Sequence, residues 1–179
     1  VSEAIYLSDP DGNGIEVYRD RPRSGWKYEH GQIKMDTLPL DYRGILAELD
    51  GDQTPWTGLD PATILGHMHL HVGDLAAAGK FYTEVVGFDF LLNYGGSAMF
   101  FSAGGYHHHL GANTWAGVGA PPPPPNSVGL RYFEIQLVNA QERANLIDRL
   151  NAAGVTYEDR GRDLFVRDPA QNGVLFKAA

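Results

Sequence analysis

The amino-acid sequence predicts an α+β fold made of tandem βαβββ modules. Three observations lead to this prediction. First, Gly66–Val72 alternates strictly between apolar residues and histidines, which is the pattern of a half-buried β-strand. Second, a helical pattern and three further strand patterns follow it. Third, the same order of patterns recurs at an offset of 65 residues, which indicates a repeated supersecondary unit.

Length and composition limit the classes of protein that fit. The 179 residues allow one domain, or one domain and a fragment, and 43% hydrophobic residues suffice for a core. The chain has no cysteine, which excludes disulfides and a thiol nucleophile. A formal charge of −8 argues against nucleic acid or an anionic membrane as partner. No stretch resembles a signal peptide or a membrane span, so we expect a cytoplasmic protein.

The chain opens with a predicted β-hairpin over residues 3–20. Strand patterns at Ala4–Leu7 and Ile15–Tyr18 flank the turn-forming run Asp9–Gly14. Alternation places Glu16 on one face of the second strand, opposite its two apolar neighbours. A lone hairpin is marginally stable in water. We therefore expect it to pair with strands from later in the chain or from another polypeptide.

The next region, residues 21–64, is rich in prolines and glycines and reads as a surface linker. Asp41–Leu49 has the apolar spacing of one short helix. We expect the tryptophans and tyrosines of this linker to be packing anchors.

The strand at Gly66–Val72 carries three histidines on one face, His67, His69 and His71. Its other face is apolar and should contact a core. Histidine is the commonest metal-ligating side chain, so a metal site is one interpretation of this face. Hydrogen bonding of the imidazoles in a polar groove is the alternative.

The rest of the first module follows directly. Asp74–Val86 is a predicted helix, with Asp74 as N-cap and Gly87 just after its end. Three strand patterns come next, at residues 88–93, 98–102 and 106–113. In the last of these, alternation puts His107 and His109 on the face opposite the core.

A run of five prolines, Pro121–Pro125, then predicts a stiff polyproline II spacer. The second module begins with an alternating strand at Leu130–Leu137 and a helix that starts at Asn139 and closes at Gly154. Its remaining strands are predicted near residues 155–158, 164–167 and 173–177.

Internal alignment defines the predicted domains. Placing Val72 on Leu137 pairs His67 with Tyr132 and His69 with Glu134. Asp168–Leu175 also matches Asp9–Glu16, at an offset of 159, so the opening hairpin reads as the end of a further module. The predicted parts are residues 1–20 (hairpin of a preceding module, missing here or supplied by a partner), 21–64 (linker) and 65–179 (C-terminal domain, with modules 65–115 and 128–179).

These motifs resemble the vicinal oxygen chelate superfamily of glyoxalases, bleomycin-resistance proteins and extradiol dioxygenases. The resemblance lies in the His67 strand with Val72–Leu75, in Phe81–Tyr82 with Gly87–Phe88, and in the Asp9–Glu16 hairpin. Within the superfamily the sequence is most similar to two-domain catechol 2,3-dioxygenase-like proteins, through Tyr106–His109 with Asn113–Trp115 and through Tyr18–Pro22. The resemblance implies a half-open mixed β-barrel with flanking helices.

It also implies a divalent metal, Fe(II) in the first place and Mn(II) or another metal as alternatives. By position, His67 matches a first-strand ligand, Glu16 the last-strand glutamate, and His109 or His107 an active-site histidine. The second module departs from the pattern, because Tyr132 stands where a histidine is expected and Leu175 where a glutamate is expected. His69 and Glu134 are the candidate replacements, and Tyr132 is a candidate proton-transfer group.

Three functions remain open at this stage. The first is an extradiol dioxygenase that cleaves a catecholic substrate with O2, since two histidines and one carboxylate leave open positions on the metal. The second is a small-molecule binding module with an aromatic cleft at Tyr132, Trp115 and His109. The third is glyoxalase-type isomerase or lyase chemistry. We expect a homo-oligomer, or association with the missing N-terminal modules.

Overall fold

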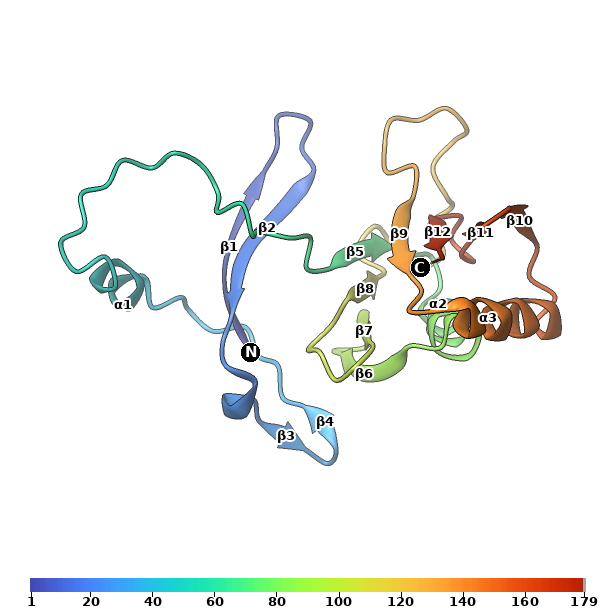
Figure 1. The fold of residues 1–179 in the computed structure, drawn as a ribbon, viewed down its shortest axis with the longest axis horizontal. Helices are drawn as coiled ribbons and strands as arrows, with labels where there is room; N and C mark the ends of the chain where they lie inside the picture. The colour runs from blue at the N-terminus through green and yellow to red at the C-terminus, as the bar shows by residue number, and fades with distance from the viewer. Residues whose placement is uncertain (179) are drawn as a thin grey trace. The chain divides into compact units, whose positions relative to one another are not determined.

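A computed structural model describes residues 1–178 and shows two compact units, Val1–Ile64 and a second unit that begins at Leu65 (Figure 1). Each unit is described by itself. No helix within residues 1–178 has the length and apolar character that a membrane crossing requires.

The first unit is built around one antiparallel hairpin. Its strands are β1 (Ser2–Ser8) and β2 (Gly14–Asp20), paired in register from Ser2 with Asp20 to Ser8 with Gly14. Turn chemistry at Asp9 explains the reversal, because its Oδ1 accepts hydrogen bonds from the backbone N–H groups of residues 11 and 13. This part of the sequence therefore forms the predicted hairpin.

The linker region contains more structure than the sequence indicates. Its elements are the 3-10 turn η1 (Arg23–Gly25), the two-residue strands β3 (Tyr28–Glu29) and β4 (Gln32–Ile33), and the helix α1 (Tyr42–Ala47). The predicted helix is confirmed, with Asp41 as its N-cap.

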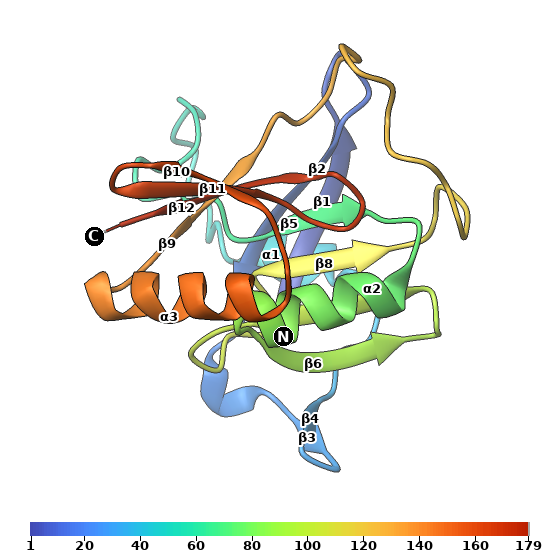
Figure 2. The same ribbon diagram turned by 90° about the vertical axis from the view of Figure 1, so that its right-hand side faces the viewer.

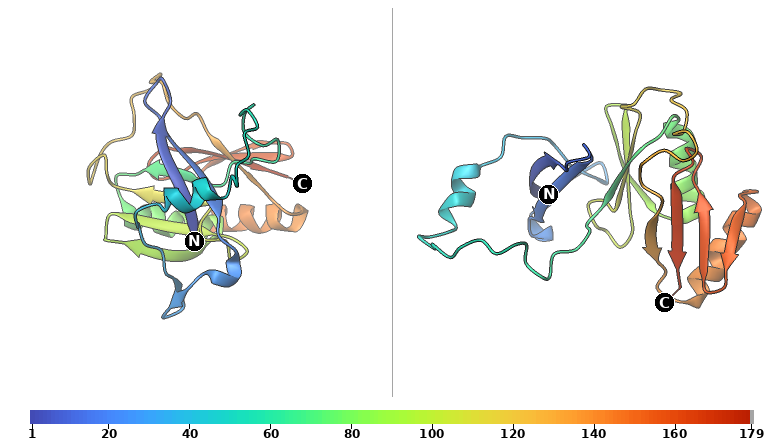
Figure 3. Two further views of the ribbon diagram at one scale, coloured as in Figure 1. Left: turned by 90° about the vertical axis from the view of Figure 1, so that its left-hand side faces the viewer. Right: turned by 90° about the horizontal axis from the view of Figure 1, so that it is seen from above.

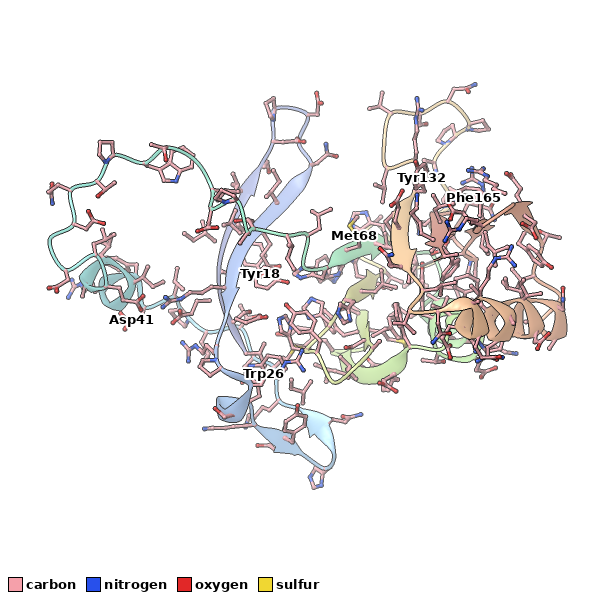
Figure 4. The ribbon with its side chains drawn as sticks, viewed as in Figure 1. Tyr18, Trp26, Asp41, Met68, Tyr132 and Phe165 are labelled. Carbon is pink, nitrogen blue, oxygen red and sulfur yellow. The ribbon has the colours of Figure 1, made fainter. Side chains whose placement is uncertain are left out.

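The tryptophans and tyrosines of this region differ in their packing. Trp26 is buried and donates its indole N–H to the Arg21 carbonyl at 3.0 Å (Figure 4). The expectation of packing anchors is wrong for Trp56, which is 82% exposed, and for the exposed Tyr28 and Tyr42. Few apolar side chains of this unit are buried, so large aromatic rings find little to pack against.

The second unit contains the two predicted modules. The first comprises β5 (Met68–His71), α2 (Leu75–Lys80), the π-helical segment η2 (Phe81–Val86), β6 (Asp89–Tyr94), β7 (Ala98–Ser102) and β8 (Leu110–Asn113). The second comprises β9 (Phe133–Gln136), α3 (Ala140–Ala152), β10 (Tyr157–Arg160), β11 (Asp163–Arg167) and β12 (Gly173–Lys177).

Each module forms a four-stranded sheet with the same topology. The strand orders are β5-β8-β7-β6 and β10-β11-β12-β9. In both sheets the leading strand pairs parallel with the last strand of its own module, whereas the remaining pairs are antiparallel. The predicted α+β fold of tandem βαβββ modules is confirmed. The two sheets remain separate and do not close into a barrel.

One apolar core lies between these sheets and the helices. On β5 and the residue after it, Leu70 and Val72 are buried while His69 and His71 are exposed, as the alternation predicts. From the second module, α3 contributes Leu146 and Leu150 to the same core. Figure 2 shows α3 next to α2, and in the right-hand view of Figure 3 α3 (orange) lies along one side of the second sheet. The opposite faces of the sheets are therefore turned away from the core.

Hydrogen bonds from the side chains of Tyr82, Arg149 and Asn172 join the modules. The hydroxyl of Tyr82 in η2 donates to Asp168 Oδ2 at 2.9 Å, and both residues are buried. From α3, Arg149 donates to the carbonyls of Val85 and Val86 at 2.8 and 3.0 Å. The connection that links the modules along the chain is exposed throughout residues 121–130.

Candidate functional site

Aromatic and imidazole rings gather on the side of the first sheet that faces away from the core. We call this surface the histidine face and define it by His67, His69, Phe100, His108 and Trp115. The His69 ring lies 5.8 Å from the Phe100 ring, edge to face, and 5.0 Å from the Trp115 ring. Rings at these separations attract one another, so the face is an ordered polar-aromatic surface.

Gly111 makes this packing of rings possible. Strand register places it beside His69 on one side and Phe100 on the other. A Cβ atom at Gly111 would lie 3.2 Å from three atoms of the His69 ring, which is closer than side chains ordinarily approach. The histidine therefore occupies the space that a side chain on β8 would fill.

His108 is the histidine that joins His67 on this face. Their ring centroids lie 4.3 Å apart, and the Phe100 ring lies 4.8 Å from His108. Burial, reinforced by the neighbouring histidines, lowers the pKa of His108 to about 2. His108 is therefore neutral at physiological pH, and it can accept a proton only at a large energetic cost.

The predicted placement of His107 on the same face as His109 is wrong. Strand β8 begins only at Leu110, and residues 104 and 105 are glycines with positive φ, so the chain reaches β8 through a loop. His107 is 1% exposed, and its Nδ1 lies 2.9 Å from Nδ1 of His108. The alternation of a strand does not hold in this segment, and the two adjacent glycines were the available signal.

His109 turns toward the strand β7. Its Nδ1 accepts a hydrogen bond from the backbone N–H of Ala103 at 3.3 Å and lies 3.4 Å from Ser102 Oγ. Its ring lies 4.8 Å from the Tyr106 ring, tilted by 39°. An Nδ1 that accepts from an N–H group leaves the proton of a neutral imidazole on Nε2. His109 is exposed.

Tyr132 and Glu134 belong to the other sheet. Tyr132 precedes β9, is 40% exposed and meets the Phe165 ring edge to face at 6.3 Å (Figure 4). Glu134 is exposed and lies opposite Leu175 in the ladder between β9 and β12. The superfamily resemblance predicts a glutamate at position 175. The leucine that stands there has no atom that can bind a metal, so it gives the Glu134 carboxylate an apolar neighbour.

Glu16 lies in the first unit, on β2, directly opposite Tyr6 on β1. Partial burial of the Tyr6 hydroxyl and its hydrogen bond to Glu16 raise the pKa of Tyr6 to about 12. The hydroxyl therefore stays protonated at neutral pH and donates to the carboxylate. Sequence analysis missed Tyr6, although the turn at Asp9–Gly14 fixes the register that pairs it with Glu16.

The candidate metal ligands do not gather into one cluster in the described part of the chain. Within residues 1–178 no three histidine, aspartate or glutamate side chains are placed so that they could hold one ion. The candidate ligands lie on separate elements: Glu16 in the first unit, His67 and His69 at the first sheet, and Glu134 on the second sheet.

A cavity of about 470 Å³ lies at the start of α2. None of the candidate site residues lines it. The lining residues are Gly73, Asp74, Leu75, Ala76, Gly96, Thr114, Val118 and Gly119.

A family model and a relative of known name match this sequence and agree with each other. Residues 64–176 match the family model described as Glyoxalase/Bleomycin resistance protein/Dioxygenase superfamily. Over 177 residues, 98% of this chain, the sequence is 49% identical to a catechol-2,3-dioxygenase of Bacillus subtilis (strain 168). The chain spans 61% of the length of that relative.

Solved structures show the same fold. A lactoylglutathione lyase from Agrobacterium tumefaciens aligns with a TM-score of 0.52 and 23% identity, over 67% of this chain and 96% of that one. A glyoxylase/bleomycin resistance protein/dioxygenase domain from Frankia sp. EAN1pec aligns with a TM-score of 0.51 and 18% identity, over 65% and 92% of the two chains.

Proposed function

Because the chain belongs to the Glyoxalase/Bleomycin resistance protein/Dioxygenase superfamily, we propose that it contributes to an extradiol dioxygenase that cleaves the ring of a catecholic substrate with O2. The observation that carries this proposal is the 49% identity to a catechol-2,3-dioxygenase along nearly the whole chain. The solved relatives support the fold alone, so they give no reason to prefer isomerase or lyase chemistry.

In this proposal Glu16 is the carboxylate ligand of a divalent metal, Fe(II) in the first place, and histidines from outside these 179 residues complete the set. Glu16 is suited to this role, because the Tyr6 hydroxyl donates a hydrogen bond to its carboxylate across the hairpin. Outer partners of this kind fix the orientation of a ligating carboxylate. When bound, the metal would bring the catecholate and O2 together on one ion.

An irregular site at His67, His69 and Glu134 is the competing arrangement within the C-terminal unit. Two observations count against it. The described chain brings no three such side chains together around one point, and Leu175 occupies the position opposite Glu134. We therefore assign the metal to the unit that contains Glu16.

The test uses the complete polypeptide that the gene encodes, purified and analysed for bound metal and for the yellow ring-cleavage product of catechol. Glu16→Gln should lose the bound metal and lower kcat/KM by more than about 100-fold, which exceeds the usual effect of an outer-sphere partner. Glu134→Gln is the matched control and should retain both. Retention of metal and activity in Glu16→Gln, with loss of both in Glu134→Gln, would reverse the assignment.

A second candidate function applies to the C-terminal unit alone. Tyr132 and Leu175 replace expected ligands, while the histidine face presents imidazole and aromatic rings at stacking distances. These features favour metal-independent binding of a small aromatic molecule. Catechol should then raise the Tm of residues 65–179 equally with and without EDTA. A Tm shift that EDTA abolishes would exclude this function.

A further inference from the structure

Two hairpin loops of this chain have the same local structure. The loop between β1 and β2 is built by Asp9 and Asn13, and the loop between β11 and β12 is built in the same way by Asp168 and Asn172. In each loop the aspartate Oδ1 accepts a hydrogen bond from the asparagine backbone N–H, at 2.7 and 2.8 Å. The other carboxylate oxygen accepts a hydrogen bond from the asparagine side chain, at 2.8 and 2.9 Å.

Glycine follows both of these asparagines, and the sequence has no other Asn–Gly pair. The Cγ atom of an asparagine can be attacked by the backbone nitrogen of the next residue. The new C–N bond closes a succinimide ring, the Cγ–Nδ2 bond breaks, and the amide leaves as ammonia with the proton of the attacking nitrogen. Water then opens the ring at either carbonyl, which leaves aspartate or isoaspartate. Glycine favours the attack because it has no side chain beside the nitrogen and has the widest backbone freedom.

The pair Asn13–Gly14 is open to this reaction. Both residues are exposed, and a Cβ atom at Gly14 would meet no atom within 4 Å. Farther along β2, Ile15 and Val17 are each 40% exposed. Little packing therefore opposes a local opening of this end of the strand.

Packing holds the pair Asn172–Gly173 in place. Gly173 is buried, and a Cβ atom there would lie 2.4 Å from the Arg131 carbonyl oxygen. The Asn172 side chain also donates a hydrogen bond to the His71 carbonyl at 3.4 Å. Val174, the next residue of β12, is completely buried. Because the attack on Cγ requires the backbone and the side chain to rotate, Asn172 can react only when this part of the fold opens.

A carboxylate at position 13 would face the carboxylate of Asp9. The hydrogen bond from the Asn13 side chain is the largest of the influences that hold the pKa of Asp9 below its usual range. Replacement of this amide by a carboxylate removes a donor and places two negative charges side by side, where they repel each other. Isoaspartate also adds a methylene group to the backbone, next to the pair formed by Ser8 and Gly14. Both products therefore disfavour the closed loop.

We propose that Asn13 is a site of spontaneous deamidation, and that its conversion to aspartate or isoaspartate loosens the β1–β2 hairpin. The reaction needs only water and releases ammonia. It is a covalent change that accumulates as the protein ages. This proposal rests on the two loops and is independent of the catalytic assignment.

The first experiment incubates the folded 179-residue chain in mildly alkaline buffer and follows deamidation by peptide mapping with mass spectrometry. Asn13 should deamidate at least about tenfold faster than Asn172, whose reaction requires local opening. Asn126 is also exposed but is followed by Ser127, so it should react more slowly than Asn13 as well. Deamidation of Asn13 that is no faster than that of these two asparagines would overturn the proposal.

Gly14→Ala tests the chemistry with little change to the fold. Its Cβ atom has open space, so the circular dichroism spectrum should match that of the wild type. The methyl group should slow deamidation of Asn13 at least about tenfold, because it crowds the attacking nitrogen. Gly25→Ala, which also has open space around Cβ, is the control and should leave the rate unchanged. A wild-type rate in Gly14→Ala would overturn the proposal.

Asn13→Asp reproduces one of the two products and tests the effect on the hairpin. The backbone amides of β1 and β2 should exchange hydrogen at least about tenfold faster in this variant than in the wild type. Asn126→Asp adds the same charge in the exposed connection between the modules and should leave this exchange unchanged. Wild-type protection of the hairpin in Asn13→Asp would overturn the proposed loosening.

Discussion

Tyr82 combines a buried aromatic ring with a buried hydrogen bond. It is completely buried, contacts the rings of Phe81 and Phe101, and donates its hydroxyl to Asp168. Burial and the adjacent carboxylate raise the pKa of Tyr82 well above its usual value of 10. The hydroxyl therefore remains protonated in the folded protein over a wide range of alkaline pH.

Removal of this hydroxyl should destabilise the fold in a pH-dependent way. Tyr82→Phe should lower the free energy of unfolding at pH 7 by about 1–3 kcal/mol, because a buried carboxylate oxygen loses a donor. Above about pH 10 the unfolded wild-type chain ionises Tyr82 while the folded protein does not, so wild-type stability falls. The difference between the two proteins should therefore shrink as pH rises. Urea titrations between pH 7 and 11 measure it.

The half-exposed Tyr94 provides the control for this prediction. Tyr94→Phe should change stability by less than about 0.5 kcal/mol at pH 7. A difference between wild type and Tyr82→Phe that widens with pH would contradict the assigned direction of the pKa shift.

At the residue scale, sequence alternation identifies His67 and His69 but not His108. His69 lies in β5 and His67 immediately precedes this strand, so period-two alternation indicates which face they occupy. His108 precedes β8, and its position depends on a loop that begins with two glycines of positive φ. Alternation carries no information once the backbone leaves the extended conformation.

At the scale of elements, the pairing of helices across the modules depends on Arg149. Its guanidinium lies at the end of η2 and donates hydrogen bonds to the carbonyls of Val85 and Val86. The last carbonyls of a helix have no hydrogen-bond donor within the helix itself. A planar fork of donors suits this geometry, whereas an ammonium group does not. The contact fastens α3 to the end of a helix from the other module.

Arg149→Lys should therefore lower the free energy of unfolding by about 1–3 kcal/mol, since one of two buried carbonyls loses its donor. Asp148→Asn, an exposed neighbour on the same helix, should change it by less than about 0.5 kcal/mol. Urea denaturation followed by fluorescence measures both variants. Equal stability of Arg149→Lys and wild type would show that these bonds are replaced by water.

Element types are more predictable than their internal geometry. The sequence indicates one helix over Asp74–Val86, and Asp74 does cap it, but residues 81–86 adopt π-helical hydrogen bonding. The hydrophobic pattern is compatible with either helix, and long-range packing selects between them. The short strands β3 and β4 were not predicted, because two-residue strands leave no periodic signal.

At the scale of the whole molecule, the apolar core belongs to the second unit. Every member of the large core cluster lies between Leu70 and Phe176, while Trp26 and Ile33 are the buried apolar side chains of residues 1–64. Burial of apolar surface is the main source of stability. The second unit therefore contains what it needs to fold.

A protein consisting of residues 65–179 should unfold cooperatively, with a Tm within about 4 °C of the 179-residue chain. Residues 1–64 alone should show no cooperative transition, because so small a core leaves folding marginal. Differential scanning calorimetry of the two fragments measures both outcomes. A non-cooperative 65–179 fragment would show that its core requires the first unit.

The repeat was the most informative whole-molecule signal in the sequence. An offset of 65 residues predicts two sheets of equal topology, and the structure has them. The same alignment identifies Tyr132 and Leu175 as departures from a metal-binding pattern. Sequence alone did not show that the β1–β2 face is exposed while its β11–β12 copy is buried, because exposure depends on which segments pack against each hairpin.

The exposed connection at residues 121–130 joins the two modules covalently, whereas the contacts that hold the modules together lie elsewhere in the second unit. A protease that cleaves among these residues would sever the backbone while leaving the buried core, Tyr82–Asp168 and the Arg149 contacts in place. The severed halves would then behave as a heterodimer held by non-covalent forces. Each half could be isotopically labelled alone and recombined, so that NMR signals of one module are observed in the presence of the silent other.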